Sequence, residues 1–109
     1  MATTYKVLGQ VNPAATTATT LYTVPSATNT VVSTIVVCNQ AASAATFRIA
    51  VRPAGATLAA IHYVAYDVTV GASDSTALTL GLTLAATDVI TVYGSTATLS
   101  FTAFGSEIA

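Results

Sequence analysis

Apolar and polar residues alternate along most of this sequence, in short runs that end at Pro, Gly, Asn or Asp. A period of two places successive side chains on opposite faces of a β-strand, whereas an amphipathic helix needs apolar residues three and four positions apart. The clearest run, residues 76–84, alternates Leu with Thr or Gly. It predicts one continuous half-buried strand, and the pattern as a whole indicates a chain built from strands.

Eight runs of this kind predict strands, and no segment has a helical period. They are residues 5–10, 21–24, 30–39, 47–52, 61–70, 76–84, 88–93 and 99–108. About eight short strands in a chain of 109 residues predict a single all-β domain, residues 1–109, folded as a β-sandwich of the immunoglobulin-like or jelly-roll kind. The order of the strands in the sheets does not follow from the pattern.

Two of the runs suggest how their faces are used. Strict alternation in residues 30–39 places Ile35 and Val37 on one face and Val32 and Val36 on the other, so both faces are largely apolar. A strand that is apolar on both sides is expected to be covered on both sides, by the core and by a neighbour. In residues 61–70, alternation places even-numbered and odd-numbered side chains on opposite faces.

Charged residues are scarce. They make up 6% of the chain, against about 25% in ordinary soluble domains, while hydrophobic residues make up 53%. The surface must therefore consist mainly of Thr, Ser, Ala and Asn. Such a surface suits lasting contact with protein, since each immobilised Lys or Arg costs roughly 1.5–2 kcal/mol of side-chain entropy. We expect a module that packs against its own copies or other proteins; the alternative is a monomer with an unusual Thr-rich surface.

Several classes of function are disfavoured. A net charge of -1 with no cluster of Lys and Arg gives no footprint for nucleic acid. The longest apolar run, residues 35–38, is far shorter than the roughly 20 residues that span a bilayer. The first ten residues lack the apolar stretch of a signal peptide. The single cysteine, Cys38, excludes an intrachain disulfide and is expected to be a small buried hydrophobe in a reducing compartment.

No catalytic, metal-binding or cofactor-binding set is expected. The single histidine, His62, lies five residues from Asp67 on a predicted strand, so the two side chains should point to opposite faces. Asp74 and Asp88 fall in predicted turns, where Asp commonly bonds the local backbone. We therefore predict that the chain is not an enzyme and carries no cofactor.

Seven residues are candidates for contact with a partner. Arg48 and Arg52 lie four residues apart on one strand, on the same face and about 13 Å apart, where they would clamp an acidic surface or remain solvated. The other five are Lys6 and four tyrosines, which bury a large area at low entropy cost and keep a polar tip. Tyrosine in a strand is also an ordinary core residue. The tyrosines are Tyr22, Tyr63, Tyr66 and Tyr93.

Six segments carry a resemblance to a known family. They are residues 20–25 (TLYTVP), 31–39 (VVSTIVVCN), 47–51 (FRIAV), 63–67 (YVAYD), 82–88 (LTLAATD) and 104–107 (FGSE). These segments resemble small virion proteins of tailed bacteriophages, over nearly the whole chain. The likeness lies in strand sequence and not in a catalytic signature.

The resemblance implies a structural part of a virion that is assembled in the host cytoplasm. The role it favours is a capsid decoration or cement protein, often a trimer, that binds the major capsid protein and bridges neighbouring shell subunits. The alternative is a component of the tail, baseplate or fibre attachment region. A third hypothesis is a glycan-binding attachment module, although the chain has no Trp for stacking on sugars.

Overall fold

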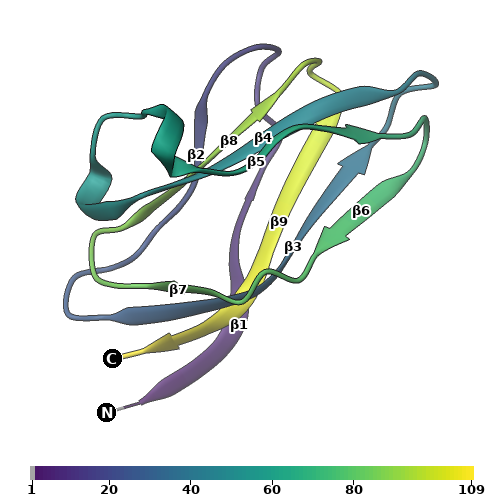
Figure 1. The fold of residues 1–109 in the computed structure, drawn as a ribbon. Coiled ribbons are helices and arrows are strands. Elements are labelled where there is room, and N and C mark those ends of the chain that lie inside the picture. Colours follow the sequence, from purple (N-terminus) through teal and green to yellow (C-terminus); the bar gives the residue numbers. More distant parts are fainter. Residues whose placement is uncertain (1) are drawn as a thin grey trace.

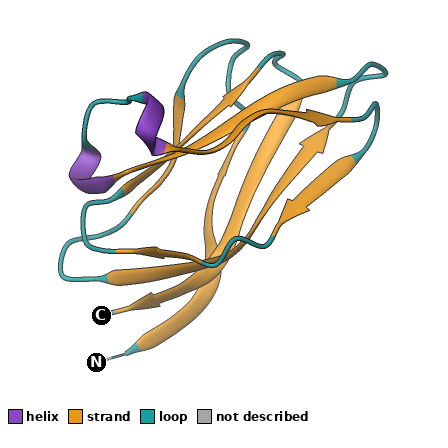
Figure 2. Cartoon of the chain, in the orientation of Figure 1, coloured by secondary structure: helices purple, strands orange, loops and turns teal. Residues whose placement is uncertain are grey.

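Two antiparallel sheets pack face to face in the computed structural model, which describes residues 2–109 (Figures 1 and 2). These residues form nine strands and two short helical turns, joined by loops. The elements are β1 (Thr3–Val11), β2 (Thr19–Thr23), β3 (Asn29–Asn39), β4 (Ala45–Arg52), η1 (Pro53–Gly55), η2 (Ala60–His62), β5 (Tyr63–Val70), β6 (Ser75–Leu78), β7 (Leu82–Leu84), β8 (Val89–Gly94) and β9 (Leu99–Ile108). The predicted all-β sandwich is confirmed.

The strand order identifies the kind of sandwich. The first sheet has the order β1-β9-β3-β6, with β7 also paired to β3, and the second has the order β2-β8-β4-β5. Since β6 and β7 both pair with β3, they are two pieces of one interrupted strand. Counted in this way, eight strands form two sheets of four in the order of a jelly roll. An immunoglobulin-like sandwich would pair its first two strands in one sheet, whereas here they lie in different sheets.

The interruption between β6 and β7 corrects the predicted strand over residues 76–84. Gly81 has a φ of 63°, a left-handed conformation that a pleated strand does not contain. Leu80 next to it is exposed instead of facing the core. Leu78 and Leu82 still pack against the core, and Leu84 belongs to it. The alternating pattern therefore predicts the two ends of this strand and misses the break.

A β-bulge in β3 shifts the predicted faces of that strand. Val32 pairs with Gly105 and Thr34 with Phe104, so Ser33 is an extra residue opposite β9. Beyond the bulge, Ile35 joins Val32 on the buried side, where strict alternation had separated them. The outer side remains rich in small and apolar residues. It includes Cys38, which is partly exposed and not fully buried as predicted.

A second bulge lies in β5. Phe47 of β4 pairs with Val68 and Ile49 pairs with Ala65, so Tyr66 and Asp67 together lie opposite Arg48. Asp67 has a φ of 51°, which Asp tolerates better than most residues. As a result Tyr66 and Asp67 are both exposed, although alternation placed them on opposite faces.

The core lies between the two sheets. Phe47 of the second sheet meets Phe101 of the first in an edge-to-face contact, with ring centroids 6.1 Å apart and planes at 75°. Ile35, Ile49 and Ile90 are fully or almost fully buried around the two rings. Burial of each such side chain contributes about 1.5–3 kcal/mol to folding. The contacts between the sheets thus supply most of the stability that short strands lack by themselves.

One buried side chain holds together the loops at one end of the sandwich. Asn39, 1% exposed at the end of β3, donates hydrogen bonds to the carbonyl oxygens of Ser43 and Gly71. Its Oδ1 atom accepts hydrogen bonds from the N–H of Ala41 and the hydroxyl of Thr98. Three separate loops therefore converge on one amide group.

Asp88 has the same role at the opposite end. Its two carboxylate oxygens accept hydrogen bonds from the N–H groups of Ala54 and Ala85, each at 2.9 Å. The carbonyl oxygen of Asp88 also accepts a hydrogen bond from the N–H of Val24. The turn before β8 is thereby linked to the loops that follow β2 and β4.

We predict that Gly105→Ala destabilises the fold by about 1–3 kcal/mol, the usual cost of overpacking. A Cβ atom on Gly105 would overlap the backbone carbonyl of Val31, which cannot move without disturbing the ladder between β3 and β9. Gly71→Ala is the matched control, because its Cβ would make only ordinary contacts with Asp74, and it should change stability by less than about 0.5 kcal/mol. Equal urea-unfolding midpoints for the two variants would contradict the prediction.

Candidate interaction surfaces

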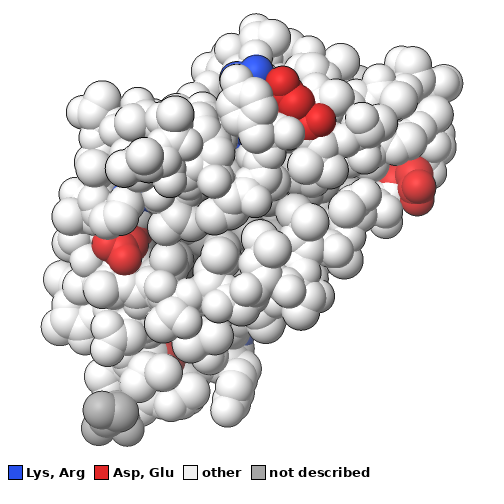
Figure 3. All heavy atoms as spheres, viewed as in Figure 1, with Lys and Arg blue, Asp and Glu red and all other residues white. Residues whose placement is uncertain are grey.

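The outer face of the first sheet carries no charged side chain among the described residues. We call this surface the neutral face. Its members follow from the strand register and the burial pattern. They are Thr3, Tyr5, Val7, Gln10, Asn29, Val31, Ser33, Thr34, Val36, Cys38, Ser75, Ala77, Thr83, Ser100, Thr102, Phe104, Ser106 and Ile108. Elsewhere, charged side chains are isolated spots on an otherwise uncharged surface, as the view in Figure 3 illustrates.

The neutral face exposes large apolar side chains. Tyr5 is 84% exposed, Val7 46% and Phe104 39%. Tyr5 and Phe104, with Val31 and Ser33 beside them, line a shallow open groove of about 580 Å³. Lys6, whose ammonium is paired with Glu107, is also among the lining residues. Contiguous exposed apolar surface of this kind is typical of sites that contact other proteins. The neutral face is therefore the first candidate contact surface.

The outer face of the second sheet is partly covered by the chain itself. The loop between β4 and β5, which includes η1 and η2, folds against β4 and β8 (Figure 2). Ala50 and Thr91 point to this outer side and are nevertheless buried. Arg52 holds the loop, since Nε donates to Oγ1 of Thr91 and Nη1 donates to the carbonyl oxygen of Ala56, each at 3.0 Å. Arg52 is thus engaged within the chain, and its contact with an acidic partner surface stays a prediction.

Four of the seven predicted contact residues lie together on the second sheet, on strands β4, β5 and β8. The Arg48 guanidinium lies over the rings of Tyr66 and Tyr93, 4.2 Å and 4.4 Å from their centroids. Nε of Arg48 donates to Oδ1 of Asp67 at 2.7 Å, and Tyr63 packs edge to face on Tyr66 with centroids 5.0 Å apart. We call these five residues the Arg48 cluster. The hydrogen bond to Asp67 is the main cause of a raised Arg48 pKa.

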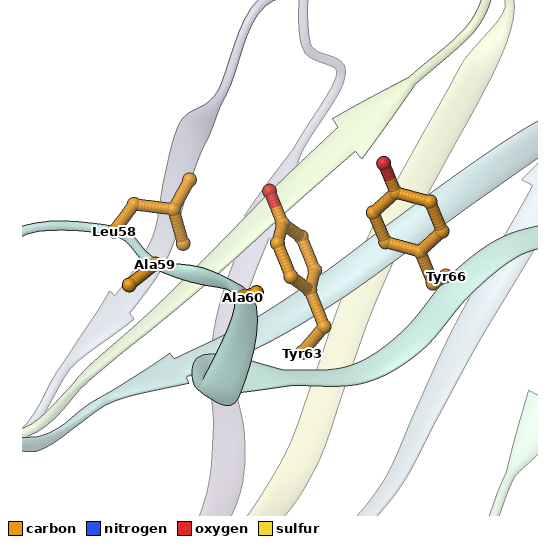
Figure 4. Close-up of a pocket in the computed structure, with 5 residues that line it drawn as sticks. All are labelled: Leu58, Ala59, Ala60, Tyr63 and Tyr66. Carbon is orange, nitrogen blue, oxygen red and sulfur yellow. The ribbon is translucent and has the colours of Figure 1, made fainter.

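Asp67 was missed as a partner of Arg48, because alternation placed it away from Tyr66. Only the bulge in β5 brings Tyr66 and Asp67 to the same surface, and a bulge depends on the partner strand as well as on the sequence. Beside the cluster lies an open pocket of about 470 Å³ (Figure 4). Its lining residues are Leu58, Ala59, Ala60, Tyr63 and Tyr66.

The remaining predicted contact residues, Lys6 and Tyr22, meet at Glu107. The Tyr22 hydroxyl donates to Oε2 of Glu107 at 2.5 Å and lies 2.9 Å from the hydroxyl of Thr30. Nζ of Lys6 forms an ion pair with Oε1 of Glu107 at 3.0 Å. Tyr22 is only 8% exposed, so it is a core residue and not a surface anchor. The prediction of Tyr22 as a contact residue is therefore corrected.

This partly buried contact changes the acidity of Glu107 and of Tyr22. Hydrogen bonds from Tyr22 and then Lys6 hold the pKa of Glu107 below its usual range. Burial, followed by the hydrogen bond to Glu107, raises the pKa of Tyr22 to about 12. The ionised carboxylate and the neutral phenol are thus the forms that the fold favours.

His62 and Asp67 are engaged separately. Nδ1 of His62 accepts a hydrogen bond from the N–H of Ala59, while Asp67 binds Arg48. Within residues 2–109, no three His, Cys, Asp or Glu side chains are grouped closely enough to hold a metal ion. Neither helical turn in this range has the length to cross a membrane. Comparison with protein-family models and with curated proteins gave no match.

We predict that Glu107→Gln lowers the free energy of unfolding by about 1.5–3 kcal/mol at pH 7, the typical contribution of a hydrogen bond to a charged group. Because the folded-state pKa of Glu107 is lowered, its stabilising effect is present above the unfolded-state value of about 4.3 and is lost as the pH falls through the folded-state value. The difference in the free energy of unfolding between wild type and Glu107→Gln should therefore decrease as the pH is lowered from 6 to 3.

Urea unfolding at several pH values measures this difference. Tyr22→Phe is the matched variant, because it removes one donor to Glu107 and leaves Lys6 in place. It should reduce the pH dependence only in part. A constant difference between wild type and Glu107→Gln across this range would show that the carboxylate charge adds nothing to the contact.

Proposed function

We propose that this chain is a structural, non-catalytic protein of a tailed-bacteriophage virion, which decorates the capsid and stabilises the shell by bridging its subunits. The observation that carries the proposal is the neutral face, whose members carry no charge and among which Tyr5, Val7 and Phe104 are exposed. The charged residue beside its groove, Lys6, is already paired with Glu107. The likeness of six segments to phage virion proteins supports the same role. So does the jelly roll, a fold that viral capsid proteins share with lectins, although this support is by analogy.

The chemistry of the neutral face suits lasting protein contact. A charged side chain would have to lose its hydration on binding, and the members of the neutral face, which are all uncharged, do not carry this cost. Thr and Val are stiff at χ1, and Ala has no side-chain entropy to lose, so their immobilisation is cheap. Apolar burial then contributes about 25 cal/mol for each Å² removed from water.

The difference between the two outer faces supports a one-sided attachment. The second sheet has its own loop packed across part of it, while the first sheet has no such cover among the described residues. We propose that the neutral face contacts the major capsid protein and the covered face points to solvent. Self-association, with the trimer favoured, belongs to the same proposal, and light scattering measures it directly.

We predict that Phe104→Glu reduces binding to purified phage particles lacking this protein by at least about tenfold, a loss of about 1.4 kcal/mol. The charge would be buried without a partner in the contact. Val64→Glu is the matched control, because Val64 is 43% exposed, close to the 39% of Phe104, but lies in the second sheet. Co-sedimentation measures binding, and circular dichroism checks that both variants fold.

Equal binding of the two variants would overturn the assignment of the neutral face. Microscopy of intact particles separates the capsid role from the tail, baseplate or fibre alternative. Many copies spread over the shell support decoration, whereas one small ring of copies at the tail contradicts it. Particles without this chain should also lose resistance to heat, and unchanged resistance would remove the stabilising role.

A further inference from the structure

The pocket beside the Arg48 cluster combines apolar walls with unused hydroxyl groups. Leu58 and the rings of Tyr63 and Tyr66 form its sides, and the two tyrosine hydroxyls point the same way in Figure 4. Within the described residues, the hydrogen bonds of tyrosine hydroxyls are those of Tyr22, so the hydroxyls of Tyr63 and Tyr66 are available to a ligand. A ligand in this pocket would therefore meet carbon surface on its flank and hydrogen-bonding groups at its edge.

Arg48 and Asp67 add a second polar edge next to Tyr66. The Asp67 side chain is 47% exposed, and Nη2 of Arg48 is 3.4 Å from its Oδ2 atom. Because these two side chains neutralise each other, the edge offers donors and acceptors without net charge. A phosphate or a free carboxylate would have to compete with Asp67 for Arg48.

The position of Tyr66 is held firmly. Its ring contacts the Arg48 guanidinium and also packs edge to face with the ring of Tyr63. The neighbouring Asp67 is the one non-glycine residue of the described chain that has positive φ inside a strand. Bulges of this kind redirect side chains, and backbone outliers gather at binding sites. A pocket fixed in this way loses little entropy when a ligand binds.

We propose that this pocket binds one neutral pyranose unit of a glycan. A pyranose ring has apolar C–H faces and hydroxyl groups around its edge, which complement the tyrosine rings and the surrounding polar groups. The volume of about 470 Å³ lies within the usual range of small-molecule sites, about 300–1,000 Å³.

A proline-rich peptide also binds aromatic side chains, but it needs a groove that runs along an extended chain. Here the loop before β5 contributes Leu58, Ala59 and Ala60 to one side of the pocket. This shape accommodates a ring better than an extended peptide. The proposal goes beyond capsid decoration and does not depend on it, because the pocket lies on the second sheet and the neutral face on the first.

The test is a titration of the full ¹⁵N-labelled chain with methyl glycosides of neutral hexoses and of N-acetylhexosamines, followed by NMR. We expect at least one sugar to shift the amide signals of Ala59, Ala60 and Tyr66, with a dissociation constant in the millimolar range. Tyr66→Ala should weaken this binding at least about tenfold by removing the stacking surface. Tyr63→Phe should weaken it about two- to tenfold by removing one hydroxyl.

Tyr5→Ala is the control, because it removes an equally large exposed ring from the neutral face and should leave sugar binding unchanged. A proline-rich peptide and inorganic phosphate are titrated in parallel. The proposal is overturned if no neutral sugar shifts the pocket signals, if Tyr66→Ala binds as wild type does, or if only the peptide or phosphate binds. Particle binding by Tyr66→Ala is measured separately, so failure of the glycan site and failure of the decoration role are distinguishable.

Discussion

Contact between the two inner sheet faces is the interaction on which the rest of this structure depends. Phe47 and Phe101 meet across the sandwich, and strands as short as β7 would not be stable without such a partner surface. The jelly-roll order makes this dependence stronger, because most connections pass from one sheet to the other. Asn39 and Asp88 then join the loops at the two ends, where the crossing segments come together. The outer faces of the two sheets do not take part in this contact, and their side chains therefore differ in charge and in cover.

The fold class was predictable because the period of two is a property of the strand itself. The alternation failed where the pleat is interrupted, as at Ser33, at the pair Tyr66 and Asp67, and at Gly81. A bulge or a break depends on the partner strand and on the space available, and neither can be read from one run of residues. Each of these local changes moved side chains to another face, so the predicted composition of the faces was less accurate than the predicted strands.

The candidate surfaces were predictable by residue type more than by position. Arg48, Tyr66 and Tyr93 were all predicted as contact residues by their type, but they come from three strands that only the sheet order brings together. Tyr22 has the same chemistry, but the inward side of β2 carries it into the core against Glu107. The sequence holds no signal for this difference, since the runs that contain these tyrosines look alike. Topology separates a core tyrosine from a surface one.

The seven charged side chains are almost entirely occupied within the chain. Lys6 pairs with Glu107 and Arg48 with Asp67, while Arg52, Asp74 and Asp88 make hydrogen bonds to nearby backbone or side-chain groups. Little field extends from such a surface, so no electrostatic steering guides it toward a partner. Encounters would then proceed at the unsteered rate, roughly 10⁵–10⁶ M⁻¹s⁻¹, and would vary little with ionic strength. Attachment of this kind is governed by how long the contact lasts and not by how quickly it is found.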